Sequence, residues 1–118
     1  MTLRECYEAM EGDYEGTIGR MPSERLIQKY VLKFPADPSF ENLKKAIEGR
    51  EEEEAFRAAH TIKGICANLG LSKLLKSSSS LTDALRSGWS SEAESLFDQV
   101  ESDYRQTVEA IGQFGSSL

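Results

Sequence analysis

The sequence is short of long apolar runs, of cysteine, of histidine and of positive charge, and each shortage excludes a class of protein. No apolar run approaches the roughly 20 residues that a membrane-spanning helix needs. The N-terminus has neither the basic segment nor the long apolar segment of a secretory signal. We therefore expect a cytoplasmic protein that has no membrane segment.

The cysteines, Cys6 and Cys66, are too few for a disulfide framework, and no cluster of cysteine and histidine has the spacing of a zinc site. Lysine and arginine number 14 against 20 aspartate and glutamate residues, so the net charge is −6. Nucleic acids and anionic membranes both attract basic surfaces, so this acidic balance argues against either as a partner. We expect no bound metal and no other cofactor.

What the chain has in abundance is helical periodicity. Its 118 residues, 39% apolar and 29% charged, are enough for one domain with a single modest core. Apolar residues recur every three or four positions, and no segment alternates apolar and polar residues in the manner of a strand. The main helices are expected at residues 38–48, 51–69, 71–87 and 91–112.

Helix starts are marked by residues that can satisfy free backbone N–H groups. Thr2 and Ser91 each begin a capping box, with a glutamate three residues later, and Ser23 is placed to cap a helix over Glu24–Phe34. Asp37 followed by Pro38 is a strong start signal for the next helix, because proline fits the first helical position.

Short connections make successive helices antiparallel neighbours, which predicts an all-α fold built on an up-and-down antiparallel four-helix bundle. The bundle is expected to span about residues 38–112, with shorter N-terminal helices, about residues 2–34, packed over one end. Within these, Gly16 and Gly19 are expected to loosen the segment 14–21 into a broken turn. We expect one domain and a monomer, since a bundle of this size can bury its core alone.

The helix expected at 51–69 carries His60, the only histidine of the chain. On a helical wheel with Ile62 pointing inward, the apolar stripe around it consists of Ala55, Ala58, Ala59, Ile65, Cys66 and Leu69. His60 lies about 160° from Ile62, so its ring faces outward. Gly70 is well placed to close this helix in the left-handed conformation.

The neighbours of His60 on the outward face are unusual for a solvated surface. Gly64 lies in a helix interior, where glycine costs about 1 kcal/mol relative to alanine, and its missing side chain leaves room beside the imidazole. Lys63 can bring an ammonium group near the ring. Phe56 and Ala67 are apolar where polar residues are expected, which suggests a docking surface.

An outward imidazole could serve several chemistries. Acid–base catalysis normally needs a pocket and an orienting partner, which a helix face does not offer. A Ser/His/Asp arrangement stays open, although no G-x-S-x-G elbow accompanies it, and a single histidine is a poor metal site. Phosphoryl transfer fits better, because a neutral imidazole is a good nucleophile and a nearby cation stabilises the transferring group.

The residues around His60 resemble the signature of histidine-containing phosphotransfer (HPt) domains. The motif consists of His60, then Lys63-Gly64, then the helix-closing Gly70 and a leucine-rich second helix. Upstream, the resemblance also includes Phe34, Leu43-Lys44-Lys45-Ala46-Ile47 and Glu54-Ala55-Phe56-Arg57-Ala58. It covers roughly residues 24–110.

The resemblance implies a bundle that accepts a phosphoryl group on His60 and exchanges it with the aspartate of a response-regulator receiver domain. Lys63 would stabilise the phosphate and Gly64 would leave the ring accessible. The partner, a receiver domain or a hybrid histidine kinase, would dock on a surface that comprises Phe56, Arg57, Ala67 and Asn68. This is the phosphorelay of bacterial-type two-component signalling.

The resemblance also implies limits on the activity. Neither the dimerisation motif of histidine kinases nor a glycine-rich nucleotide box is present, so the chain is expected to carry a phosphoryl group and not to phosphorylate itself from ATP. The magnesium used in such exchanges belongs to the receiver. Many family members have a glutamine or an acid beside the histidine on the next helix, where this chain has Thr82, so no role is transferred to that position.

Two other interpretations are compatible with the sequence. The chain is alternatively a helical adaptor that uses the Phe56/Ala67 face only for docking and is never phosphorylated. It is also compatible with the phosphoacceptor module of a chemotaxis-type kinase taken from a longer chain, although the start at Met1 argues against this.

Overall fold

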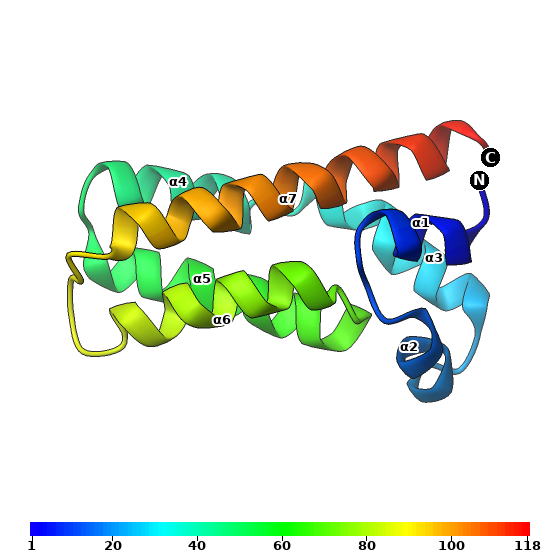
Figure 1. Ribbon diagram of the computed structural model, residues 1–118, viewed down its shortest axis with the longest axis horizontal. Helices are drawn as coiled ribbons and strands as arrows, with labels where there is room; N and C mark the ends of the chain where they lie inside the picture. Colours follow the sequence, from blue (N-terminus) through cyan, green and yellow to red (C-terminus); the bar gives the residue numbers. More distant parts are fainter.

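The computed structural model describes all 118 residues, and its regular structure is entirely helical (Figure 1). In chain order the elements are α1 (Leu3–Ala9), α2 (Tyr14–Arg20), α3 (Glu24–Lys33), the 3₁₀ turn η1 (Phe34–Ala36), α4 (Ser39–Glu48), α5 (Glu52–Leu69), α6 (Ser72–Leu85) and α7 (Ala93–Ser116). None of these helices combines the length and the apolar character that crossing a membrane requires.

The four long helices form the up-and-down antiparallel bundle that the sequence predicts. Each of α4, α5 and α6 packs against the next helix in the chain, and α7 closes the bundle by returning to α4. The shorter α1, α2 and α3 gather at one end of the bundle, beside the C-terminal half of α7 (Figure 1). The two chain termini meet there, where the Ser117 hydroxyl donates to the Met1 carbonyl at 3.2 Å.

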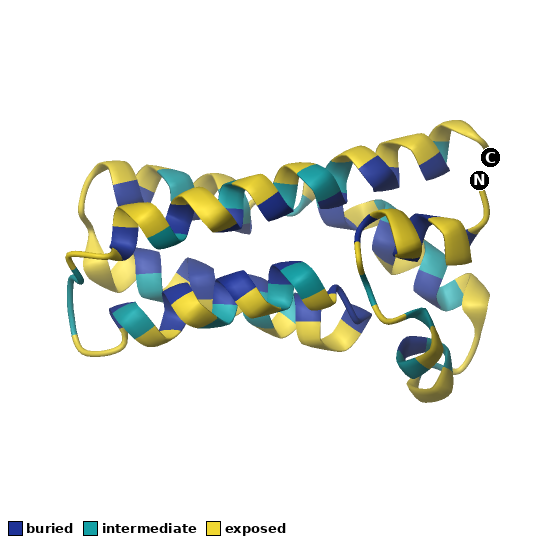
Figure 2. Ribbon diagram, viewed as in Figure 1, coloured by how far each residue is buried: buried dark blue, intermediate teal, exposed yellow.

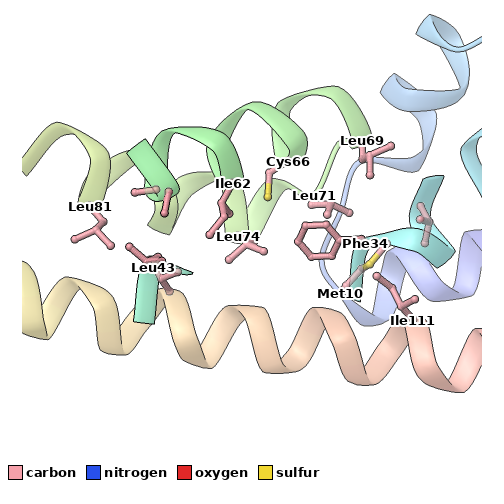
Figure 3. Packing of buried hydrophobic residues seen from close by; sticks show 14 of the residues in the cluster. Met10, Phe34, Leu43, Ile62, Cys66, Leu69, Leu71, Leu74, Leu81 and Ile111 are labelled. Carbon is pink, nitrogen blue, oxygen red and sulfur yellow. The ribbon is translucent and has the colours of Figure 1, made fainter. Parts of the chain in front are cut away.

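A single hydrophobic core runs along the bundle and continues beneath the N-terminal helices. The buried residues form stripes on the inner sides of the helices, while the outer sides are exposed (Figure 2). Leu43, Ile62 and Leu74 lie between the bundle helices, and Met10 and Phe34 extend the packing towards the N-terminal end (Figure 3). Fully burying side chains of this kind contributes roughly 1.5–3 kcal/mol each, so this stripe fixes which side of α5 faces inward.

Two predicted caps and the end of α5 before the left-handed Gly70 are confirmed, whereas α6 ends at residue 85, two residues before the predicted end. Thr2 and Glu5 form the capping box, and the Ser23 side chain accepts the Leu26 N–H. The predicted start of α4 is displaced by one residue: Pro38 is the N-cap and the helix begins at residue 39, although the Asp37 carboxylate accepts the Ser39 N–H at 2.8 Å.

Two predictions about the last helix are wrong. The capping box at Ser91 does not form, because the turn before α7 is made by the Ser90 carbonyl, which accepts the Ala93 N–H, and α7 begins only at residue 93. The helix also continues to residue 116, beyond the expected end at 112, because Phe114 is buried beneath the N-terminal helices. Gly112 therefore lies inside a helix that tertiary packing extends.

Three other expectations need correction. The segment 14–21, expected as a broken turn, forms the regular helix α2, because the Asp13 side chain caps it at the Gly16 N–H. Ile65, which the wheel placed in the inward stripe, is only half-buried at its edge. The 24–34 helix ends one residue early and passes into η1, because Pro35 has no N–H with which to continue the helical hydrogen bonds.

The N-terminal helices satisfy the last carbonyls of α5. The Tyr7 hydroxyl donates to the Leu69 carbonyl at 2.7 Å, and the Thr17 hydroxyl lies 3.2 Å from the same oxygen. The Arg20 guanidinium reaches the carbonyls of Ala67 and Asn68 at 3.3 and 3.5 Å. A helix C-terminus carries unpaired carbonyls and partial negative charge, so these donors stabilise the end of the helix that carries His60.

Candidate functional site

His60 lies near the middle of α5 on the face that points away from the bundle, and its side chain is exposed. The opposite face of α5 is buried through Ala55, Ala58, Ala59, Ile62, Cys66 and Leu69. This burial fixes the rotation of the helix, so the single imidazole is held towards solvent. The sequence predicted this orientation correctly.

The ring of Phe56, one turn before His60, lies against the imidazole. The two ring centroids are 5.9 Å apart and the planes are parallel to within 3°. Side chains of a helix lean towards its N-terminus, so the imidazole leans over the turn that carries Phe56. Phe56 is half-buried and also packs against the edge of the core, which anchors it.

Arg86, at the C-terminal end of α6, contacts the same phenylalanine from the neighbouring helix. Its guanidinium carbon lies 5.6 Å from the Phe56 ring centroid, within the usual range of a cation–π contact. Arg86 also makes an exposed ion pair with Asp83, with a nitrogen–oxygen distance of 3.3 Å. A chain of contacts therefore runs from α6 through Phe56 to His60.

The opposite side of the imidazole, towards the C-terminus of α5, is open. A Cβ atom placed on Gly64 would meet nothing within 4 Å. A longer side chain at this position would lean back over His60, one turn earlier. The glycine therefore leaves free space beside the ring, and helix packing does not require it, because no neighbouring element approaches it.

Lys63 is the cation of α5 closest in sequence to His60 on its C-terminal side, and its side chain is half-exposed. None of the seven ion pairs of the molecule includes it. Its ammonium group is consequently available to an anion near the imidazole. Three residues along a helix bring two side chains to the same face, so this arrangement follows from local geometry.

The four residues predicted to form the docking surface are spread along the exposed side of α5. Phe56 is half-buried, while Arg57, Ala67 and Asn68 are exposed. Arg57 is turned towards Glu53, with which it pairs at 3.4 Å. Phe56 therefore differs from the other three in lying against His60 itself.

Two clefts flank α5, and His60 lines neither of them. One, of about 300 Å³, lies between α4 and α5 and includes Arg57 and Thr61. The other, of about 610 Å³, lies at the C-terminal end of α5 and includes Asn68, Arg20 and Tyr30. An imidazole outside both clefts lacks the surrounding groups that bind and orient a small substrate there, so it suits a reaction completed by a partner's groups.

The two thiols of the chain are inaccessible. Burial raises the pKa of the Cys66 thiol to about 12 and that of the Cys6 thiol to about 11, so neither is ionised near neutral pH. Thr82, the residue that the HPt resemblance compares with an orienting glutamine, is fully buried and donates to the Ser78 carbonyl at 2.7 Å. Its hydroxyl is therefore engaged within α6 and makes no hydrogen bond to His60.

The sequence did not predict the contact of Arg86 with Phe56 or the hydrogen-bond donors that the N-terminal helices supply to the end of α5. Arg86 had a weak signal: it and Phe56 lie at equal distances along the chain from Leu71, where α5 turns into the antiparallel α6. Tyr7, Thr17 and Arg20 had no such signal, because the path of the chain between α2 and α5 is not encoded in local spacing.

Comparison with known proteins identifies the family to which the bundle is similar. The family model described as Hpt domain, the family that the motif resembles, matches residues 32–113. This match includes all four helices of the bundle and leaves out α1 and α2 and nearly all of α3. Searches of the curated proteins and of the solved structures found no match.

Proposed function

This chain belongs to the Hpt domain family, whose members take part in histidine phosphotransfer in two-component signalling, and we propose that it is a phosphorelay carrier phosphorylated on His60. The observation that supports this assignment is the combination around one imidazole: an exposed ring, open space at Gly64 and an unpaired ammonium at Lys63. Its partners would be response-regulator receiver domains and hybrid histidine kinases. The protein would act as a monomer in the cytoplasm.

The proposed reaction is a reversible exchange between two side chains. The lone pair of the unprotonated ring nitrogen of His60 forms a P–N bond with the phosphoryl group of a receiver phosphoaspartate. The P–O bond to the aspartate breaks, its electron pair leaves with the carboxylate, and the proton on the other ring nitrogen can pass to water. The transferring group spreads negative charge over its oxygens, so an adjacent cation stabilises the transition state.

The test is incubation of the protein with a receiver domain whose aspartate has been labelled with ³²P. Label should pass to this chain and should be acid-labile and base-stable, as a phosphohistidine is. Receivers encoded near this gene are the first partners to try. Failure to accept label from any of them, while still binding one, would favour the adaptor interpretation.

We propose that Lys63 neutralises charge during transfer. Lys63→Ala should slow transfer from a phosphorylated receiver by about tenfold, since one mobile and partly exposed cation is lost. Quench-flow measurement of the labelled products gives this rate. The melting temperature should not fall, because Lys63 has no ion pair and alanine favours helices.

Lys76→Ala is the matched control for this substitution. Lys76 is an exposed lysine of α6 beside the cleft that faces α7, so the same charge is lost away from His60. It should transfer at the rate of the unmodified protein. A large fall in melting temperature for Lys63→Ala would instead assign the lysine a structural role.

We propose that Gly64 keeps the imidazole accessible. Gly64→Gln should raise the melting temperature by about 3 °C, because glutamine favours a helix interior over glycine by most of a kcal/mol. The same variant should slow transfer about tenfold or more, because the new side chain leans over His60. Thermal unfolding followed by circular dichroism and the labelled-receiver assay measure the two effects.

Gly112→Gln provides the control for the helix effect. Gly112 also lies in a helix interior, on α7, and a Cβ atom placed on it would likewise meet nothing within 4 Å. This variant should gain similar stability and transfer at an unchanged rate. Unchanged transfer in Gly64→Gln would show that the glycine has no role in access.

We also propose that the N-terminal helices belong to the same single domain, although the family match begins at residue 32. Tyr7, Thr17 and Arg20 from these helices satisfy the last carbonyls of α5. Removing them would expose those carbonyls and the apolar residues beneath. The whole chain, residues 1–118, would then fold and act as one unit.

A further inference from the structure

We propose that Phe56 and Arg86 are positioning residues for the proposed phosphotransfer, holding the His60 imidazole in the orientation that reacts. The inference rests on the proposed function and assigns Phe56 a second role, beyond contact with the partner. It is drawn from the contact chain Arg86–Phe56–His60, which joins the outer edges of α6 and α5.

The His60 ring has no polar group to orient it. Hydrogen bonds on this part of α5 and α6 engage Thr61 and Thr82 with backbone carbonyls, and none includes His60. Thr82 of α6 is fully buried, and its hydroxyl donates to the Ser78 carbonyl of its own helix. The parallel ring of Phe56, with centroids 5.9 Å apart, is the contact that remains.

Phe56 can hold another ring only if it is itself held. Its inner edge packs against the core, and its exposed side is covered by the Arg86 guanidinium at 5.6 Å. Arg86 is in turn tied to Asp83 on its own helix at 3.3 Å. Because the anchor comes from α6, the orientation of the imidazole depends on the pairing of two helices and not on α5 alone.

The contact with Phe56 leaves the imidazole covered on one side and open on the other. Phe56 covers the side of the imidazole towards the N-terminus of α5, whereas the Gly64 side is open. An exposed histidine without such a contact would sample several rotamers, and that freedom would have to be lost before each transfer. Stacking restricts the ring beforehand and leaves its edge free, where the lone pair of the reactive nitrogen lies in the plane of the ring.

A small phosphodonor separates positioning from docking, because it has no protein surface to dock. Phosphoramidate is the probe: the His60 nitrogen forms the P–N bond, the donor's own P–N bond breaks, and ammonia leaves. Phe56→Leu should react about threefold to tenfold more slowly than the unmodified protein, and Phe56→Tyr, which keeps the ring, should react normally. Arg86→Gln should give a smaller loss, about twofold to threefold.

Arg105→Gln is the control for the loss of an arginine charge. Arg105 is an exposed arginine of α7 that pairs with an acid one turn away and contacts no aromatic ring near His60. It should react at the unmodified rate. Circular dichroism of every variant confirms that the bundle remains folded, which is expected because both Phe56 and Arg86 lie at the surface edge.

NMR supplies a readout that a purely structural role would not change. With one histidine in the chain, the imidazole gives a single set of ring proton signals. In Phe56→Leu these signals should move towards random-coil positions as the ring current of Phe56 is lost, and in Phe56→Tyr they should stay. Unmoved signals in Phe56→Leu would overturn the stacking contact.

The reaction rates with phosphoramidate and with a receiver distinguish positioning from docking. A normal phosphoramidate rate in Phe56→Leu, together with slower transfer from a receiver, would make Phe56 a docking residue only and would overturn the inference. Failure of the unmodified protein to accept label from receivers would instead refute the proposed function. The phosphoramidate comparison would still report whether Phe56 orients the ring, so the two failures are distinguishable.

Discussion

His60→Gln is expected to abolish uptake of label from a phosphorylated receiver, to below the detection limit of the assay. The chain has no second histidine, and both thiols are buried with pKa values raised to about 11 and 12. Glutamine has a similar length but no nucleophilic ring nitrogen. A phosphoryl group on serine, threonine or cysteine is not a phosphoramidate, so label that is acid-labile and base-stable should be lost together with His60.

The fold should not change in this variant. His60 is exposed and glutamine is a good helix former, so the melting temperature should stay within about 2 °C of the unmodified value. A folded variant that still acquires base-stable label would refute the assignment of His60. Mass spectrometry of the labelled peptide would then identify the residue that accepts the phosphoryl group.

Gly70→Ala should destabilise the fold strongly, although it adds only one methyl group. Gly70 ends α5 with φ +68°, a left-handed conformation that costs a residue with a side chain about 1–2 kcal/mol. A Cβ there would also overlap the Thr17 hydroxyl and lie 3.0 Å from the Asp13 carbonyl. We expect a total loss of about 3 kcal/mol, which lowers the melting temperature by about 10 °C.

The loss should be accompanied by weaker attachment of α2 to the bundle. The Gly70 carbonyl accepts the Asp13 N–H at 2.8 Å, so a shift of this turn disturbs the contact that places Thr17 beneath the end of α5. Hydrogen exchange of the α2 amides should therefore accelerate more than that of α6 amides. This pattern distinguishes local release of α2 from uniform weakening of the core.

Gly49→Ala is the matched control, because Gly49 also ends a helix but has φ −87°. A Cβ there would lie 3.2 Å from a Glu51 carboxylate oxygen, a flexible group that can move. The expected loss is below about 1 kcal/mol. Equal losses at the two glycines would show that the left-handed turn and the Thr17 contact do not account for the effect.

The bundle was predictable because its information is local. A stripe such as Ala55, Ile62 and Leu69 repeats with the period of a helix, and short connections require neighbouring helices to be antiparallel. The left-handed Gly70 was predictable for the same reason, since it depends on a few adjacent residues.

The errors occur where distant residues decide the outcome. The predicted end of α7 was wrong because Gly112 and Gly115 weaken a helix locally, yet burial of Phe114 against the N-terminal end of the molecule continues it to residue 116. The predicted start of α7 was wrong because the preceding loop is held by α5, where Glu52 accepts the Trp89 N–H at 2.6 Å. Neither contact is visible in the spacing of nearby residues.

The candidate site likewise has features that the local sequence determines and features that only tertiary packing determines. That His60, Lys63 and Gly64 share one outward face of a helix follows from the order of residues alone, because one helical turn fixes their relation and the apolar stripe fixes the helix's rotation. That Arg86 covers Phe56, that Thr82 turns inward and that the N-terminal helices complete the end of α5 became apparent only in the folded molecule. These contacts depend on how whole helices are placed against one another, and that placement is set by the packing of the common core.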